Sequence, residues 1–88
     1  MLRVQKLFIQ RVSRGATVDG TIRELIRLWT NSPKQYKRIV GSMRLYSPTT
    51  FLSYWRKLPA RIREATLAKK AELSEAQLSA AARRDRSA

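Results

Sequence analysis

Apolar side chains recur at helical spacing in three consecutive stretches of the chain. The first stretch places four of them at positions i, i+3, i+4 and i+7, which share one face of an α-helix. These four residues are Ile22, Leu25, Ile26 and Trp29. The segment Thr21-Ile22-Arg23-Glu24 has the spacing of a capping box, in which a hydroxyl and a carboxylate satisfy free N–H groups at a helix start. These features predict a helix from Thr21 to about Thr30.

Two serine–proline pairs mark the helices that follow. The residue before a proline is disfavoured in the α conformation, so Ser32 and Pro33 end the first helix and begin the second, with Ser32 as its N-cap. Ser47 and Pro48 repeat this signal at the start of a third helix. Gly41 either weakens the second helix or admits another backbone close to it. The apolar residues are Tyr36, Ile39, Val40 and Met43 in the second helix, and Phe51, Leu52, Tyr54, Trp55 and Leu58 in the third.

After Pro59 the chain is rich in Ala, Arg and Lys, which predicts a long helix from Ala60 to about Arg84. A second capping box at Ser74-Glu75-Ala76-Gln77 marks a place where this helix can be interrupted. Strand patterns and internal repeats are absent from the sequence. We therefore expect an all-α protein, an extended chain of three to four short amphipathic helices with a basic N-terminal arm and little independent core. The expected regions are an arm at 1–16, a helical region at 17–71 and an Ala/Arg-rich helical tail at 72–88.

The N-terminal arm is basic and free of acids, and its apolar residues cluster in helical projection. These apolar residues are Val4, Leu7, Phe8 and Val12. The composition is typical of mitochondrial targeting peptides, which leaves a retained targeting signal as one interpretation. The alternatives are a basic extension that binds RNA or a partner protein, and a helix lying on a membrane surface.

Charge narrows the range of functions. The chain has 88 residues and a formal net charge of +13, from 19 Lys and Arg against 6 Asp and Glu. Such a chain repels itself unless an anionic partner neutralises it. Hydrophobic residues make up 43% of the sequence, which is too many for a disordered basic tail, yet no apolar run approaches the ~18 residues of a membrane span. The class of protein that remains is a small basic protein that folds on a polyanion or inside a large assembly.

The chemistry of catalysis is poorly represented. Cysteine and histidine are absent, which removes disulfides, thiolate nucleophiles, imidazole acid–base groups and the usual zinc ligands. The close pairs of acids, Asp19 with Glu24 and Glu72 with Glu75, are explained by helix capping and surface charge. We therefore expect no enzyme activity, no metal site, no cofactor and no small-molecule substrate.

The basic residues of the middle segment lack carboxylates near them in sequence, because no acid occurs between Glu24 and Glu64. A run of charge is usually a solvated helix face, but this scarcity of acids points to RNA phosphates as the counter-charge. The interleaved Tyr36, Tyr46, Tyr54 and Trp55 either stack on bases or pack against apolar neighbours, and their helical spacing favours packing. The candidate phosphate contacts are Lys34, Lys37, Arg38, Arg44, Arg56, Lys57, Arg61 and Arg63.

Two segments carry a family resemblance. They are Val18-Asp19-Gly20-Thr21-Ile22-Arg23-Glu24-Leu25-Ile26-Arg27 and Arg44-Leu45-Tyr46-Ser47-Pro48-Thr49-Thr50. Through them, over about residues 7–71, the chain resembles the small-subunit ribosomal protein S-twenty-one family, in its bacterial and mitochondrial forms. The start Phe8-Ile9-Gln10-Arg11 looks like the mitochondrial branch, in which a strand-like arm precedes the first helix.

The resemblance implies a protein of the small-subunit platform. It would lie along ribosomal RNA near the messenger exit region, beside neighbouring platform proteins. Carried over to this chain, the resemblance implicates residues of the first helix and of the segments around the second proline in RNA binding. These are Arg23, Arg27, Arg44, Tyr46, Arg56, Lys57, Arg61 and Arg63.

The chain departs from the family pattern at the third helix. Where the family has a tyrosine, an acid, a lysine and a proline, this chain has Tyr46-Ser47-Pro48. Where the family continues with a dense basic run, this chain has Phe51-Leu52-Ser53-Tyr54-Trp55. An apolar segment gains little on an RNA surface, so we expect the apolar helix faces to contact neighbouring proteins. The residues expected to do so are Ile22, Leu25, Ile26, Trp29, Phe51, Leu52 and Trp55.

These arguments lead to one expected function and two alternatives. The expected function is a structural constituent of the small subunit of the mitochondrial ribosome, in the matrix, that binds ribosomal RNA at the platform and supports translation. One alternative is a small basic accessory subunit of a mitochondrial inner-membrane complex, although such subunits usually carry a membrane span or a cysteine framework. The other is a free regulatory RNA-binding module, which would leave the apolar faces without partners.

Overall fold

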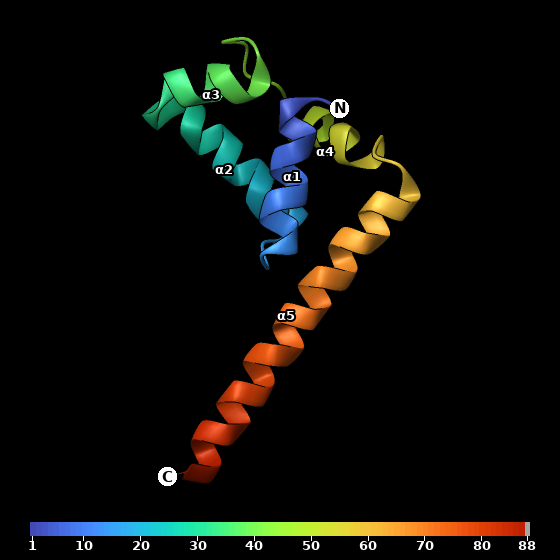
Figure 1. Ribbon diagram of the computed structural model, residues 1–88. Coiled ribbons are helices and arrows are strands. Elements are labelled where there is room, and N and C mark those ends of the chain that lie inside the picture. Colours follow the sequence, from blue (N-terminus) through green and yellow to red (C-terminus); the bar gives the residue numbers. More distant parts are fainter. Residues whose placement is uncertain (88) are drawn as a thin grey trace.

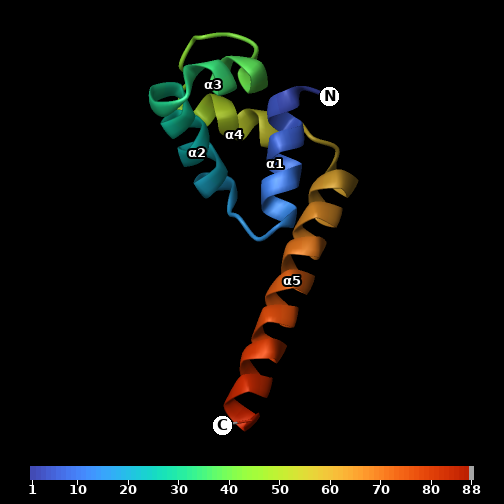
Figure 2. The same ribbon diagram turned by 60° about the vertical axis from the view of Figure 1, so that its left-hand side comes forward.

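The computed structural model describes the backbone of residues 1–87 and the side chains of residues 1–77. Residues 1–87 form helices and connecting turns without any strand, which confirms the all-α class. Helices α1 to α4 make a bundle, and α5 lies beside α1 before it extends away from that bundle (Figures 1 and 2). The helices are α1 (Arg3–Ser13), α2 (Val18–Asn31), α3 (Pro33–Val40), α4 (Pro48–Arg56) and α5 (Ala60–Ser87).

The N-terminal arm is helix α1, and it is part of the core. Val4, Leu7, Phe8 and Val12, the four residues that cluster in helical projection, are all buried. The expected strand-like arm is therefore wrong for this chain. The helix is favoured because its apolar stripe repeats every three or four residues, which a strand would distribute over both faces.

Helix α2 begins one turn earlier than the sequence predicts. Its N-cap is Thr17, whose hydroxyl accepts a hydrogen bond of 2.9 Å from the Gly20 N–H. The predicted capping box of Thr21 and Glu24 does not form, because Thr21 is already helical and donates its hydroxyl to the Thr17 carbonyl. Glu24 instead pairs with Arg11 of α1, at 3.0 Å between Oε1 and Nη2.

The two serine–proline signals are confirmed as helix starts, with one difference between them. Pro33 and Pro48 occupy the first turns of α3 and α4. Ser47 caps α4 by accepting from the Thr50 N–H at 3.3 Å, whereas the Ser32 side chain makes no capping bond. Helix α3 ends at Val40 because Gly41 adopts a left-handed conformation, with φ of 87°. The predicted continuation of this helix to Met43 is therefore wrong.

Helix α5 is continuous through Ser74, so the predicted interruption there is absent from the described backbone. Its residues have high helix propensity, and a local capping box does not outweigh that preference. The helix also crosses the expected boundary between residues 71 and 72. The turn after α1, which α5 approaches, favours Gly15 because the residue has φ of 109°, whereas a Cβ at this position would make only an ordinary contact with Leu73 Cδ2 at 3.4 Å. Side chains of residues 78–88, most of the expected tail, lie outside the described part.

The core is formed by apolar residues of α1 to α4 together with the turn that follows α4. Of the residues expected to contact neighbouring proteins, Ile22, Leu25, Phe51 and Trp55 are buried inside this chain, and Ile26 and Leu52 pack against them. The expectation that these six residues contact a neighbouring protein is therefore corrected, because α1 of this chain packs on the apolar faces of α2 and α4. Trp29 alone of the seven is exposed, at 38%. The buried core consists of Val4, Leu7, Phe8, Val12, Ile22, Leu25, Tyr36, Phe51, Trp55 and Leu58.

The core also corrects the expectation of little independent packing. Four of its ten residues come from α1, the segment expected to be an arm. Phe8 of α1 and Trp55 of α4 pack with ring centroids 6.1 Å apart, so residues far apart in sequence meet at its centre. Among the described helices, none is both long and apolar enough to cross a bilayer.

Candidate nucleic-acid interface

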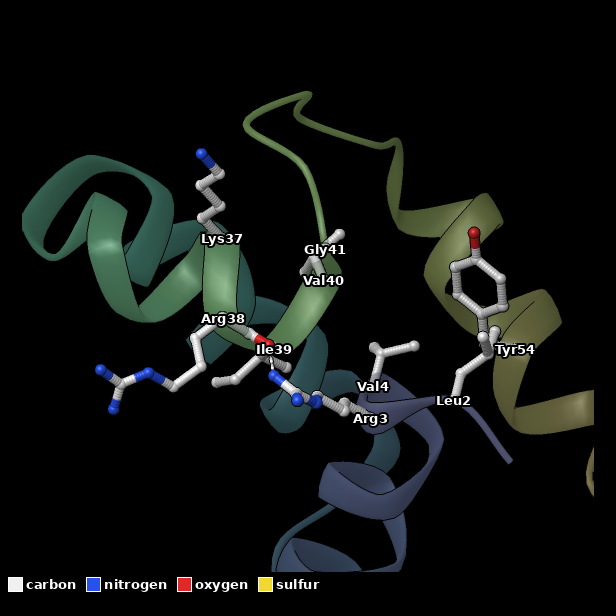
Figure 3. A pocket seen from close by; sticks show the side chains of 9 residues that line it. All are labelled: Leu2, Arg3, Val4, Lys37, Arg38, Ile39, Val40, Gly41 and Tyr54. Carbon is white, nitrogen blue, oxygen red and sulfur yellow. Dashed lines mark hydrogen bonds between the residues drawn. The ribbon is translucent and has the colours of Figure 1, made fainter.

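A cleft of about 300 Å³ lies where the start of α1 meets the end of α3 and one face of α4. Arg3 reaches across from α1 and donates a hydrogen bond of 3.1 Å from Nη1 to the backbone carbonyl of Arg38. Figure 3 shows this bond, with the side chains of Lys37 and Arg38 extending outward from α3 and Tyr54 on the opposite wall. Three cations from two helices therefore line one cleft.

The cleft combines positive charge with an apolar lining. Arg3, Lys37 and Arg38 are exposed, and the lining contains no carboxylate. Arg3 has a structural role, because a cation near the last carbonyls of a helix stabilises its C-terminus. Lys37 and Arg38 form no hydrogen bond or ion pair through their side chains among the described residues. The apolar lining consists of Leu2, Val4, Ile39 and Val40.

Two tyrosines extend this surface, Tyr54 in α4 and Tyr46 in the loop before it. The rings of Tyr54 and Tyr46 meet edge to face, with centroids 6.5 Å apart, and both residues are half-buried. The Lys57 ammonium lies 5.9 Å from the Tyr54 ring centroid, and the Arg44 guanidinium lies 5.7 Å from that of Tyr46. Both distances are within the range of cation–π attraction. We call the whole set the basic–aromatic cluster, and it comprises Arg3, Lys37, Arg38, Arg44, Lys57, Tyr46 and Tyr54.

Side-chain hydrogen bonds to backbone groups hold the segments that carry the cluster. The Gln5 amide oxygen accepts from the Leu2 N–H at 2.9 Å, and its nitrogen donates to the Tyr54 carbonyl at 3.1 Å. This amide therefore joins the start of α1 to α4. The loop that carries Arg44 is held separately, because the Trp29 indole N–H donates to the Met43 carbonyl at 2.9 Å.

Tyr36 anchors the same loop from inside the protein. Its side chain is fully buried, and its hydroxyl donates to the Arg44 carbonyl at 2.6 Å. Burial raises the pKa of Tyr36 above its ordinary value of 10.0, so the phenol stays protonated and remains a donor at neutral pH. Its position confirms packing over base stacking for this tyrosine.

The charge arrangement of the cluster suits an anionic polymer. Arg11–Glu24 is the single ion pair among the described side chains, so the five cations of the cluster have no carboxylate within ion-pair distance there. Arginine and lysine bind phosphate oxygens through charge-assisted hydrogen bonds. Basic side chains alternating with aromatic rings are typical of surfaces that bind single-stranded nucleic acid.

The structure separates the predicted RNA contacts into two groups. It brings together Lys37, Arg38, Arg44, Lys57 and Tyr46 in the cluster. The remaining predicted residues neither line the cleft nor lie against the two tyrosine rings. Most of them are exposed on other surfaces of α2 to α5, and only Arg63 is half-buried, with an Nε atom that has no hydrogen-bond partner among the described residues. They are Arg23, Arg27, Lys34, Arg56, Arg61 and Arg63.

Sequence reasoning missed two members of the cluster. Arg3 belongs to the expected arm, and for Tyr54 the sequence offers base stacking as an alternative but favours packing. The signal for Arg3 was the amphipathic stripe that begins at Val4, because burying that stripe draws the start of α1 onto the bundle. The signal for Tyr54 is its place between basic residues, but whether it lines a cleft depends on the way in which α4 packs.

Groups of three or more acidic side chains that would hold a metal ion are absent from the described residues. No protein-family model matches this sequence, and no curated protein or solved structure matches it significantly.

Proposed function

We propose that this chain is a structural RNA-binding protein of the mitochondrial small ribosomal subunit, and that the basic–aromatic cluster contacts ribosomal RNA. The observation that carries the RNA proposal is a continuous exposed surface in which three cations line the same cleft as Tyr54 and two more lie over the rings of Tyr54 and Tyr46, with no carboxylate within ion-pair distance among the described side chains. Protein surfaces of this charge ordinarily need an anionic partner.

Each part of the proposal has its own support. Positive charge and aromatic edges in one cluster support RNA as the partner. The resemblance at residues 18–27 and 44–50 to the S-twenty-one family supports a ribosomal role at the platform. The basic, acid-free composition of residues 1–16 supports a mitochondrial location, in the matrix. Since phosphate contacts carry no sequence information by themselves, the cluster would position the chain on RNA whose shape fits it.

The RNA part is tested with the purified full chain and a fluorescein-labelled single-stranded RNA of mixed sequence. The variant Lys37→Ala/Arg38→Ala removes two cluster cations that make no side-chain bonds, and it should weaken binding by at least about tenfold, since each lost charge-assisted contact is worth ~1.5 kcal/mol or more. The matched control Arg14→Ala/Lys69→Ala lowers the net charge equally, outside the cluster. Equal losses for both variants would show that binding follows total charge, which contradicts the cluster as the site.

The ribosomal part needs a separate measurement. A tagged chain expressed in cells is followed through a sucrose gradient of mitochondrial lysate in high salt, with mass spectrometry of the fractions. Co-sedimentation with the small subunit supports the proposal. Migration with an inner-membrane complex supports the accessory-subunit alternative, and a position at the top of the gradient supports a free RNA-binding module. Either of these results contradicts the ribosomal assignment and leaves RNA binding by the cluster to its own test.

A further inference from the structure

A second cleft, of about 360 Å³, lies between α1 and α5 on a different part of the molecule. Both views show α5 running beside α1 before it leaves the bundle (Figures 1 and 2). The residues that matter here are Ile9 from α1 and Arg61, Ile62, Ala65 and Lys69 from α5.

This cleft has an aliphatic floor and a cationic rim. Ile9 and Ile62 are half-buried and form its aliphatic floor beside Thr66, which is buried and donates its hydroxyl to the Ile62 carbonyl. Arg61 and Lys69 are exposed and lie one turn before and one turn after Ala65 on the same stripe of α5. Neither cation has a carboxylate within ion-pair distance among the described side chains, and the lining contains no acid and no aromatic ring.

We propose that this cleft, the α1–α5 groove, is the docking site for an acidic amphipathic helix of a partner protein. Such a helix places aliphatic side chains at i, i+3, i+4 and i+7, which would fill the floor between Ile9 and Ile62. Carboxylates beside that apolar stripe would pair with Arg61 and Lys69 across the rim. The proposal does not depend on RNA binding by the cluster.

Charge complementarity selects this occupant over two others. A second copy of the chain carries the same net charge of +13, so two copies repel each other. RNA phosphates would satisfy the rim but leave the aliphatic floor without a partner, and no aromatic ring lines the groove for bases to stack on. An acidic amphipathic helix uses both features at once.

The test uses the full chain and three labelled synthetic peptides of equal length. The first carries leucines at i, i+3, i+4 and i+7 with flanking glutamates. The second replaces its leucines with serines, and the third replaces its glutamates with lysines. Fluorescence anisotropy should show the first peptide binding at least about tenfold more tightly than either of the others. Equal binding of the leucine and serine peptides, or no binding of the leucine peptide, overturns the proposal.

A pair of variants locates the binding. Ala65→Glu puts a carboxylate between Arg61 and Lys69, where it pairs with both rim cations and narrows the groove. Ala71→Glu makes the same change of residue and charge about two and a half turns after Ile62, on the opposite side of α5. We expect Ala65→Glu to weaken binding of the leucine–glutamate peptide by at least about tenfold and Ala71→Glu to change it less than about twofold. Equal effects, with both variants showing parental helicity by circular dichroism, overturn the proposal.

RNA binding by the same variants separates this inference from the proposed function. Ala65→Glu and Ala71→Glu should lower RNA affinity equally, through net charge alone. A further loss of RNA affinity in Ala65→Glu would place the groove in the RNA interface and overturn the docking proposal. Failure of Lys37→Ala/Arg38→Ala to reduce RNA binding would contradict the cluster while leaving the peptide result unaffected.

Discussion

The Tyr36 hydroxyl donates a 2.6 Å hydrogen bond to the backbone carbonyl of Arg44, and this bond ties the loop after α3 to the buried core. The loop would otherwise be held mainly by Trp29, whose indole donates to the Met43 carbonyl from a partly exposed position. Arg44 and Tyr46 both lie in this loop. The buried Tyr36 phenol therefore positions one end of the basic–aromatic cluster. Because Tyr36 links the core to this loop, a substitution at Tyr36 should affect both the stability of the fold and the position of the loop.

Tyr36→Phe removes the donor and leaves the ring in place. We expect it to lower the free energy of unfolding by about 0.5–1.5 kcal/mol, the usual net value of one hydrogen bond. Urea denaturation followed by circular dichroism at neutral pH measures this loss. A stability equal to that of the parent would mean that water replaces the phenol at the Arg44 carbonyl without cost.

The same variant should change the response to alkaline pH. Burial raises the pKa of Tyr36 in the folded chain above its ordinary value of 10.0, so the unfolded chain loses this proton at lower pH than the folded chain. The stabilisation is complete below about pH 10 and is lost as pH rises through the folded pKa. Urea denaturation between about pH 8 and pH 11 should show a steeper fall for the parent than for Tyr36→Phe. The two proteins differ in no other ionisable group, so identical slopes would contradict the raised pKa of Tyr36.

Trp55→Ala tests the core that α1 completes. Trp55 is 7% exposed and lies against Phe8, so its truncation should lower the free energy of unfolding by about 3–5 kcal/mol. Trp29→Ala is the matched control, because Trp29 is 38% exposed and should lose less than half as much. Thermal denaturation of both purified variants gives the comparison. Equal losses would mean that α1 does not cover Trp55 in solution.

Gly41→Ala tests how α3 ends. The residue adopts φ of 87°, and a Cβ at this position would meet no atom within 4 Å, so the cost is confined to the backbone. We expect a loss of about 1–2 kcal/mol, the penalty of left-handed conformation for a residue with a side chain. Gly41→Asn should lose less, because asparagine tolerates this conformation. An alanine variant as stable as the parent would show that α3 continues past Gly41 in solution.

Local signals in the sequence predict the helix starts better than they predict which helices meet. Pro33 and Pro48 mark their helices correctly because proline acts on its immediate neighbours. The sequence predicts a capping role for Glu24 because it shows only neighbours along the chain, whereas the actual partner, Arg11, lies on another helix. The same limit applies to α1, whose apolar stripe predicts a helix but not the surface that it covers.

The candidate site shows this limit most clearly. The scarcity of acids in the sequence predicts that Lys37, Arg38, Arg44 and Lys57 bind an anionic partner. The structure places these four residues in one cluster. Arg3 joins them only because α1 packs against α3, a contact between residues 35 positions apart. Such a contact depends on the shape of the assembled core. The apolar stripe of α1 predicts that this helix is buried but not that its first turn meets the end of α3.

Salt dependence of RNA binding gives the most direct measure of how many cluster cations touch phosphate. Each phosphate neutralised on single-stranded RNA contributes about −0.7 to the slope of log K against log[salt]. If all five cations of the cluster bind phosphates, the parent should show a slope of about −3.5, and Lys37→Ala/Arg38→Ala should reduce it to about −2.1. Arg14→Ala/Lys69→Ala should leave the slope unchanged.

Fluorescence anisotropy over a salt series measures all three proteins with the same labelled RNA. A parental slope near zero would show that apolar contacts dominate, and equal slopes for the two variants would mean that the cluster is no more engaged with RNA than the rest of the basic surface.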